Sequence, residues 1–186
     1  LGDLNPVAFI MRLRLVPLRN LGACISPDNA WMFLQGLETL PLRMERHCEN
    51  AASVAQYLKT HPKVTWVRYP GLESHPQHAL VAKQMRGPGA IVSFGVKGGL
   101  EAGKTVINNV EVATLAVSLG GVETLVQHPA SMTHASMGPE ARLRAGITDG
   151  LVRVSVGIEK VEDVLADLDH ALEAAAAASR GAELPV

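Results

Sequence analysis

The sequence predicts an α/β chain in which a layer of helices covers one face of a small sheet, an arrangement of the α+β type. Three observations predict this fold class. Short apolar runs typical of strands alternate with helical runs in the second half, a long helical run precedes them, and an amphipathic helix follows the last strand. With 186 residues, 47% of them hydrophobic and 19% charged, the chain is long enough for one ordinary domain with a full core.

The first third of the chain is predicted to be helical. A helix is expected over Pro6–Leu18 and a loop over Gly22–Ser26. Ser26-Pro27-Asp28 then supplies a cap residue, a first-turn proline and an early acid, and apolar residues recur every three or four positions from Asp28 to Thr60. Because Pro41 lies inside this run, we expect a kink or a break there. A helix of this length usually bridges two parts of a molecule or two subunits.

Strands and helices are predicted to alternate in the remainder of the chain. We expect strands over Val64–Tyr69, Ala90–Val96, Ala113–Val117 and Leu151–Val156, and helices over Pro76–Met85, Gly98–Asn109 and Val161–Ala178. The last helix carries its apolar residues on one face, which must pack against something, most simply the sheet. The tail Gly181–Val186 is expected to be loose.

Composition and charge argue against several classes of function. The formal net charge is −1 and the basic residues are spread along the chain, so nothing favours nucleic acid or an anionic membrane. No apolar run reaches the roughly 18 residues of a membrane span, and no signal peptide is expected. Cys24 and Cys48 form no Cys-x-x-Cys pattern, which favours reduced thiols in a cytoplasmic protein. Neither a phosphate-binding loop motif nor a Gly-x-Ser-x-Gly elbow occurs.

The segment Ser118–His134 is the first candidate binding site. It follows a predicted strand, so we expect a loop at the end of that strand. Gly120-Gly121 would let the backbone approach a ligand closely and adopt positive φ. Hydroxyl groups are contributed by Ser118, Thr124, Ser131 and Thr133. The alternative is a polar connection whose glycines serve only turns.

The second candidate is Arg153, in the middle of the apolar strand Leu151–Val156. A buried guanidinium needs a carboxylate, a phosphate or several carbonyl partners. If this strand neighbours the loop Ser118–His134, Arg153 would bind a substrate carboxylate through two parallel hydrogen bonds. The alternative is an arginine on an edge strand, pointing to solvent.

The histidines are not expected to form a metal or catalytic site. His75 and His78 lack a third ligand at a recognisable spacing. His128 and His134 are expected to fix their loop by hydrogen bonds, and Glu123 alone is weak evidence for a general base. We therefore assign no catalytic, metal-binding or cofactor-binding residue in this chain.

Five segments resemble the family of pyridoxal 5'-phosphate (PLP) enzymes of Cys/Met metabolism. The resemblance runs in order from about Phe9 to Leu172, and it is carried by Leu21–Trp31, Gln35–Asn50, Tyr69–Pro76, Ser118–His134 and Leu151–Glu159. It implies the C-terminal part of a fold-type-I PLP-dependent transferase, in which a small sheet is covered by helices and preceded by a long kinked helix. Residues 1–25 would then be a remnant of the large cofactor-binding domain, 26–60 a connecting helix, 61–180 the substrate domain and 181–186 a loose tail.

The resemblance also implies roles for individual residues. In the family, an arginine at the position of Arg153 holds the substrate α-carboxylate, and residues matching Ser118 and Leu119 line the same pocket. Thr133 matches a residue on the substrate side of the cofactor. The cofactor lysine of the family lies upstream of everything present here, and the six lysines of this chain sit in other contexts. We therefore expect PLP to be bound by a part of the enzyme that this chain lacks, and the chain alone to be inactive.

The segments divide between subfamilies. Pro6–Arg14, Gln35–Asn50 and Gly98–Lys104 look most like O-acetylhomoserine sulfhydrylase, which replaces the acyl group of an activated homoserine ester by a sulfur nucleophile in methionine and cysteine biosynthesis. Ala116–Glu123 and Ser131–Thr133 look more like methionine γ-lyase, cystathionine γ-lyase and cystathionine γ-synthase. The sulfhydrylase is the first expectation and these enzymes are the alternative.

The expected partners are a small amino-acid substrate, the N-terminal part of the same enzyme, and further copies in a dimer or tetramer. An alternative of another class is a free-standing dimerisation or interaction domain without catalysis.

Overall fold

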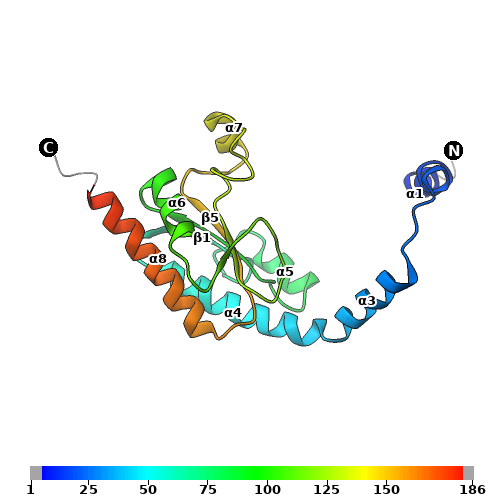
Figure 1. Cartoon of the computed structure of the whole chain (residues 1–186), viewed down its shortest axis with the longest axis horizontal. Coiled ribbons are helices and arrows are strands. Elements are labelled where there is room, and N and C mark those ends of the chain that lie inside the picture. Colours follow the sequence, from blue (N-terminus) through cyan, green and yellow to red (C-terminus); the bar gives the residue numbers. More distant parts are fainter. Residues whose placement is uncertain (1–5, 182–186) are drawn as a thin grey trace. The chain divides into compact units, whose positions relative to one another are not determined.

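A computed structural model describes residues 6–181, and the chain divides into two compact units, Leu1–Leu40 and Pro41–Val186 (Figure 1). The predicted loose tail, apart from Gly181 at the end of the last helix, lies outside the described residues. No helix among the described residues is both long enough and apolar enough to cross a membrane.

The first unit is a series of helices without a core of its own. It contains α1 (Ala8–Leu13), the π-helical turn η2 (Arg14–Leu18), α2 (Arg19–Leu21) and α3 (Pro27–Glu38). The wide turn η2 accommodates Pro17 inside the helix, and Gly22, at φ +64°, ends α2 in the left-handed conformation. None of the described residues 6–40 is buried, although many of them are apolar.

The start of α3 confirms the predicted cap. The Ser26 hydroxyl accepts a hydrogen bond from the Asn29 backbone N–H at 3.2 Å, and Pro27 occupies the first turn. The predicted break is also present, because α3 ends at Glu38 and α4 (Leu40–Thr60) begins one residue before Pro41. At this position in a first turn, the missing N–H of a proline costs no intrahelical hydrogen bond.

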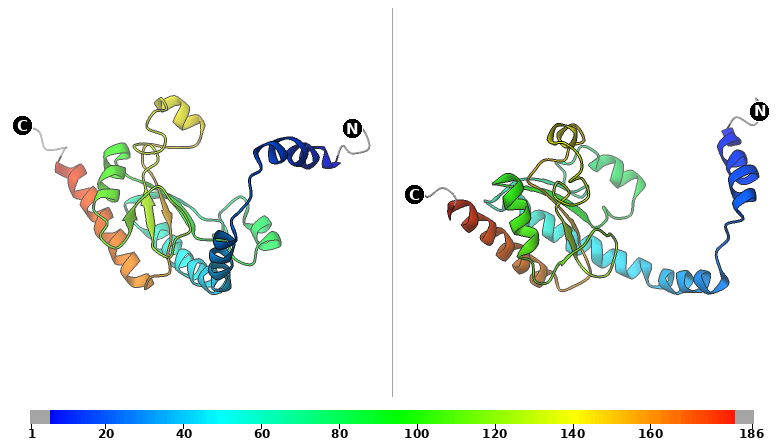
Figure 2. Two further views of the ribbon diagram at one scale, coloured as in Figure 1. Left: turned by 45° about the vertical axis from the view of Figure 1, so that its right-hand side comes forward. Right: turned by 45° about the horizontal axis from the view of Figure 1, so that its top comes forward.

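The second unit is a mixed five-stranded sheet with helices on one face, as predicted. The strand order is β1-β2-β5-β4-β3, and β3 pairs with β4 in parallel while the other pairs are antiparallel. Figures 1 and 2 show α4, α6 and α8 gathered on one side of the sheet, with α7 standing away from them. The elements are β1 (Val64–Arg68), α5 (His78–Gln84), β2 (Ile91–Val96), α6 (Gly99–Asn108), β3 (Thr114–Leu115), β4 (Leu125–Gln127), α7 (Pro139–Arg144), β5 (Leu151–Ser155) and α8 (Val161–Gly181).

The core lies between the sheet and these helices. Alternate residues of each strand point to opposite faces, and the residues on the helix side are the apolar ones. Val92, Phe94, Val126, Val152 and Val154 are fully buried, together with Val54 and Leu58 of α4, Val106 of α6, and Val164 and Leu168 of α8. The apolar face predicted for the last helix therefore packs on the sheet.

The second half of α4 belongs to this core. Ala51, Ala55 and Leu58 are fully buried, and the side chains of His47 and Asn50 reach the loop after β5. His47 Nδ1 donates to the Val156 carbonyl at 2.7 Å, and Asn50 Nδ2 donates to the carbonyls of Gly157 and Glu159 at 3.0 and 2.8 Å. The range 26–60, expected to be a connecting helix, thus holds α3 and α4, and the second half of α4 packs in the core of this unit. The assignment of 1–25, 26–60 and 61–180 to a cofactor domain, a connecting helix and a substrate domain stays a prediction.

Three local predictions differ from the structure. The strand expected over Ala113–Val117 is reduced to Thr114–Leu115, and the loop expected over Ser118–His134 contains the buried strand β4. The helix α7 was not predicted. A strand of three residues is too short for a period-2 pattern to be recognised between glycine-rich and proline-containing neighbours.

Candidate functional site

The candidate site lies on the face of the sheet opposite the helices. Arg153 is on the central strand β5, and its direct neighbours across the sheet are Ser93 of β2 and Gln127 of β4. Directly paired residues project to the same face, and the helix face is already occupied by the alternate valines. The three polar side chains therefore form one row across the centre of the sheet.

Arg153 is held with unused hydrogen-bonding capacity. Its Nη2 donates to the carbonyl oxygen of Ser118 at 3.3 Å, while its Nε is buried and has no hydrogen-bond partner among the described residues. Burial lowers the pKa of Arg153 from its ordinary value, but an arginine remains a cation at neutral pH. Because β5 is central, the alternative of an arginine on an edge strand is wrong. A half-buried cation with free donors is suited to an anionic ligand.

The segment from Ala116 to Thr124 is anchored beside Arg153 at both ends. The Gly120 backbone N–H donates to the Ser155 hydroxyl at 3.0 Å, and Gly120 adopts φ +77°, the positive value expected for a glycine in this loop. At the other end, the backbone N–H and the hydroxyl of Thr124 both donate to the Glu159 carboxylate, at 2.5 and 2.9 Å. These anchors hold Ser118, whose side chain is exposed, next to the guanidinium.

Leu119 lies in the chain between Ser118, whose carbonyl contacts Arg153, and the anchored Gly120. Its side chain is 52% exposed. The structure thus brings Ser118 into contact with Arg153, and Leu119 is the next residue of the same loop. For Ser118, the atom that meets Arg153 is the backbone oxygen and not the hydroxyl.

The fourth predicted residue, Thr133, lies on a separate turn. It is exposed, and its hydroxyl hydrogen-bonds to His134 Nδ1 at 2.8 Å. No described interaction joins it to Arg153. The turn itself is fixed by His128, which is fully buried, with Nε2 donating to the Asp149 carbonyl at 2.7 Å and Nδ1 accepting from the Ser131 hydroxyl at 2.8 Å. The prediction that His128 and His134 fix this loop by hydrogen bonds is confirmed.

The environment of His128 lowers the pKa of its ring. Burial is the largest cause that lowers its pKa, and the cations Lys104 and Arg142 act in the same direction, against the raising effect of Asp149. Gly103 of α6 lies so close that an added Cβ would be 2.4 Å from His128 Nε2. The histidine therefore has a structural role at the base of the turn.

Three residues of the site were missed by reasoning on the sequence. Ser155 and Glu159 anchor the Ala116–Thr124 segment, and Gln127 is 2% exposed beside Arg153. Gln127 Oε1 is buried without a hydrogen-bond partner among the described residues. The available signal is a glutamine directly after the apolar pair Leu125–Val126, but a strand of three residues is too short to be distinguished from the predicted loop.

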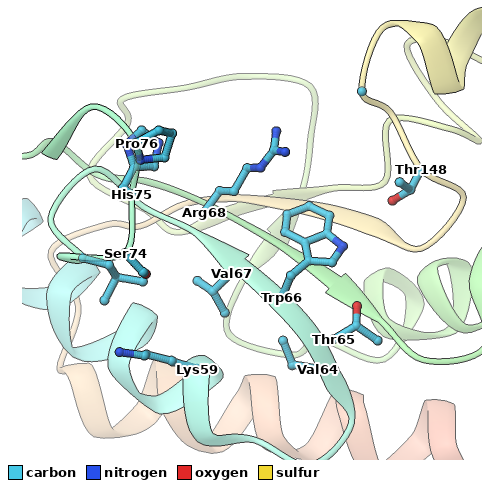
Figure 3. Close-up of a pocket in the computed structure, with 12 residues that line it drawn as sticks. Lys59, Val64, Thr65, Trp66, Val67, Arg68, Ser74, His75, Pro76 and Thr148 are labelled. Atoms are coloured by element: carbon cyan, nitrogen blue, oxygen red, sulfur yellow. The ribbon is translucent and has the colours of Figure 1, made fainter.

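Two hollows of this unit lie elsewhere. One, of about 590 Å³, runs along the outer edge of β1, where Figure 3 shows Trp66 and Arg68 pointing to the same side. The Arg68 guanidinium lies 5.6 Å from the centre of the Trp66 ring. The other, of about 640 Å³, lies between the first turns of α4 and residues 85–88. Neither is lined by Arg153 or Ser118, so the polar row lies outside both hollows.

The side chains of a group of possible metal ligands, in the middle of α8 and just after α4, already have partners. His61, Asp169 and Glu173 lie close together. Asp169 Oδ1 accepts hydrogen bonds from the Tyr57 hydroxyl at 2.5 Å and from His61 Nε2 at 3.2 Å, and Glu173 pairs with Lys63. The arrangement ties the end of α4 to α8.

The residues of the open face do not fit the aldehyde of PLP. A Schiff base needs a lysine amine, and none of the six lysines of the chain lies on β2, β4, β5 or in residues 116–134. The lysines occur at positions 59, 63, 83, 97, 104 and 160, all within the described residues. What the face does offer is the guanidinium of Arg153, with the amide of Gln127 paired beside it and the loop of Ser118 in contact with it, and a guanidinium suits the carboxylate of a substrate.

Comparison with protein families gives one match over most of the chain. A family model described as Cys/Met metabolism PLP-dependent enzyme matches residues 6–173. L-methionine gamma-lyase of Fusobacterium nucleatum subsp. polymorphum is 53% identical over 163 residues, which cover 87% of this chain and 41% of that protein. O-acetyl-L-homoserine sulfhydrylase of Leptospira meyeri is 50% identical over 175 residues, covering 92% of this chain and 39% of that protein.

Comparison with solved structures agrees. Cystathionine gamma synthase from Xanthomonas oryzae pv. oryzae, in a complex with cystathionine, has a TM-score of 0.78 and 50% sequence identity. The match covers 85% of this chain and 41% of that chain. The chain therefore spans about two fifths of the length of these relatives, and it corresponds to their C-terminal portion.

Proposed function

The chain belongs to the Cys/Met metabolism PLP-dependent enzyme family, and from this premise we propose that it supplies the carboxylate-binding face of an enzyme acting on sulfur amino acids. The observation that carries the proposal is Arg153, a half-buried cation with an unpartnered Nε at the centre of an open sheet face. A guanidinium presents donors in a planar fork that matches a carboxylate. An α-amino acid offers such a carboxylate in every substrate of this class.

The proposed activity is γ-elimination, of the kind catalysed by methionine γ-lyases. The first expectation from the sequence was O-acetylhomoserine sulfhydrylase, but the similarities favour the alternative. Methionine γ-lyases are 48–54% identical to this chain, from Fusobacterium, Porphyromonas, Treponema and Pseudomonas. The sulfhydrylase remains the second candidate, because a relative of that name is 50% identical over 175 residues.

Each predicted site residue has a proposed part in binding. Arg153 would exchange its long hydrogen bond to the Ser118 carbonyl for charge-assisted bonds to the substrate carboxylate, which are shorter and stronger. The Ser118 hydroxyl would donate to the same carboxylate, and Leu119 would cover the carbon chain beside it. Thr133 is proposed to face the cofactor side of the substrate.

The cofactor chemistry is proposed to reside outside this chain. PLP, when bound, acts as the electron sink for carbanions formed on the amino acid. Because the face around Arg153 supplies no lysine, we propose that the chain alone does not turn over substrate. What it does is bind and orient the carboxylate.

A candidate of another class is an interaction domain without catalysis. The exposed apolar residues of the first unit favour it, since Phe9, Leu21 and Trp31 are 78%, 80% and 62% exposed. An interaction domain would not need a half-buried arginine with unused donors beside an anchored glycine loop. We therefore rank it after both enzyme activities.

The test uses the full-length protein, meaning a protein that carries this chain as its C-terminal portion. We expect it to show a PLP absorbance band and to release a thiol from methionine without added sulfide. Turnover of O-acetylhomoserine with sulfide, and none of methionine, would select the sulfhydrylase instead. A full-length protein that binds no PLP would overturn both and favour the interaction domain. The isolated chain, assayed beside it, is the control.

A further inference from the structure

Two buried polar atoms on directly paired residues lack hydrogen-bond partners. Arg153 Nε is a donor, and Gln127 Oε1 is an acceptor. The two residues are partners in the antiparallel pairing of β4 with β5. Buried polar atoms are almost always hydrogen-bonded, so a donor and an acceptor left free side by side call for an explanation.

The positions of the two side chains let them meet. Side chains directly opposite in an antiparallel pair have Cβ atoms roughly 4.5–5.5 Å apart, well within the combined reach of an arginine and a glutamine. Gln127 is 2% exposed, so water does not solvate its amide freely. Val126 on one side of it is fully buried in the core and His128 on the other is held by two hydrogen bonds. The backbone of Gln127 therefore cannot move away from Arg153.

We propose that Gln127 is a positioning residue for Arg153, a role that rests on the proposed carboxylate binding. In the structure, Arg153 Nη2 donates a hydrogen bond to the Ser118 carbonyl at 3.3 Å. When a carboxylate takes over the Nη groups, Gln127 Oε1 accepts the hydrogen bond of Nε–H and fixes the plane of the guanidinium. The two Nη groups then face the ligand as a fork, the geometry that two parallel hydrogen bonds require.

The other neighbour of Arg153 provides a matched control. Ser93 is paired with Arg153 from β2, on the same face and at the same register. Its hydroxyl is on a short side chain, whereas the amide of Gln127 is on a longer one. A role that depended only on packing beside Arg153 would be shared by both neighbours.

The experiment measures carboxylate selectivity at equilibrium in the full-length protein. The probes are L-norleucine, an analogue of methionine with CH₂ in place of sulfur and hence without a γ leaving group, and its carboxamide. Their Kd values are measured by calorimetry for the natural protein, Gln127→Met and Ser93→Ala. The amine and the carbon chain are common to both probes, so the ratio of Kd values isolates the carboxylate.

We expect the natural protein to prefer the acid to the amide, and Gln127→Met to reduce that preference by roughly ten- to a hundredfold, the range for a hydrogen bond to a charged group. Ser93→Ala should retain most of the preference. In an Arg153→Ala background, Gln127→Met should have no further effect. The melting temperature should be unchanged in Gln127→Met, which removes a buried acceptor that has no partner.

Several results would overturn the inference. They are an unchanged preference in Gln127→Met, an equal loss of acid and amide binding with a lowered melting temperature, or the same loss in Ser93→Ala. A failure of the proposed function gives a different result. In that case neither methionine nor O-acetylhomoserine is turned over, while the acid-over-amide preference still depends on Gln127.

Discussion

The two faces of the sheet differ although they are built from alternating residues of the same strands. Toward the helices, β5 presents Val152 and Val154, which are fully buried among the side chains of α4, α6 and α8. Toward the open side, the residue between them is Arg153, flanked by Ser93 and Gln127. One face is closed by apolar packing, whereas the other keeps polar atoms without partners. Along this one strand, the residues that stabilise the fold therefore alternate with the residue that is proposed to bind a ligand.

Removal of a large side chain from the helix face should have the largest effect on stability. Phe94 is fully buried, and Phe94→Ala should reduce the free energy of unfolding by about 3–5 kcal/mol, from lost burial and a cavity. Ser93→Ala, one residue earlier and on the open face, should change it by less than about 1 kcal/mol. Denaturant unfolding of the chain measures both. Similar losses for the two variants would contradict the division of roles.

On the open face, replacement of Arg153 should affect binding and leave stability nearly unchanged. Arg153→Ala should lower kcat/KM of the full-length protein by about a hundredfold or more, because the carboxylate loses a charge-assisted fork of hydrogen bonds. The loss should appear mainly in KM. Arg153→Lys, which keeps the charge without the fork, should recover only part of it. Thermal unfolding should be little changed in both. Unchanged KM and kcat in Arg153→Ala would refute the carboxylate role.

A smaller effect is expected where α6 approaches the turn after β4. Gly103→Ala would place a Cβ 2.4 Å from the buried His128 ring, and such overpacking costs about 1–3 kcal/mol. Gly138→Ala is the control, since no heavy atom lies within 4 Å of the added Cβ and φ is −63°. Unfolding curves of the two variants should differ clearly. Equal stability would mean that the contact between α6 and His128 is not tight in solution.

The smallest expected effect is on the pH dependence of stability. Burial lowers the pKa of His128 in the folded chain, whereas in the unfolded chain it takes the ordinary value near 6.5. Below about pH 6.5 the unfolded chain binds a proton that the folded chain does not, so stability falls by about 1 kcal/mol per pH unit. Above that pH the contribution is fully present. Unfolding measured from pH 8 to pH 5 should show this slope, and His128→Gln should reduce it. An equal slope in the variant would assign it to other groups.

Prediction from the sequence succeeded where the structure is local. The cap at Ser26, the break before Pro41 and the apolar face of α8 depend on neighbouring residues and on helical periodicity, both of which are visible in one chain. It failed at β4, because three residues are too few to show a period, and at the edges of β3. The anchoring of the loop by Ser155 and Glu159 was also invisible, since these residues follow the loop by a long stretch of chain.

By itself, the sequence determined which residues have the chemistry for a site: a guanidinium in an apolar strand, and a glycine-rich loop with hydroxyl groups. Only the tertiary structure decided that β5 is central, that the Ser118 carbonyl meets Arg153, and that Gln127 stands beside it. The physical reason is the range of the interactions. Side-chain patterns within an element follow from its own period, whereas the order of strands depends on hydrogen bonds between segments far apart in the chain. The period of the apolar residues therefore predicts that Arg153 lies on a strand, and strand pairing places Ser93 and Gln127 beside it.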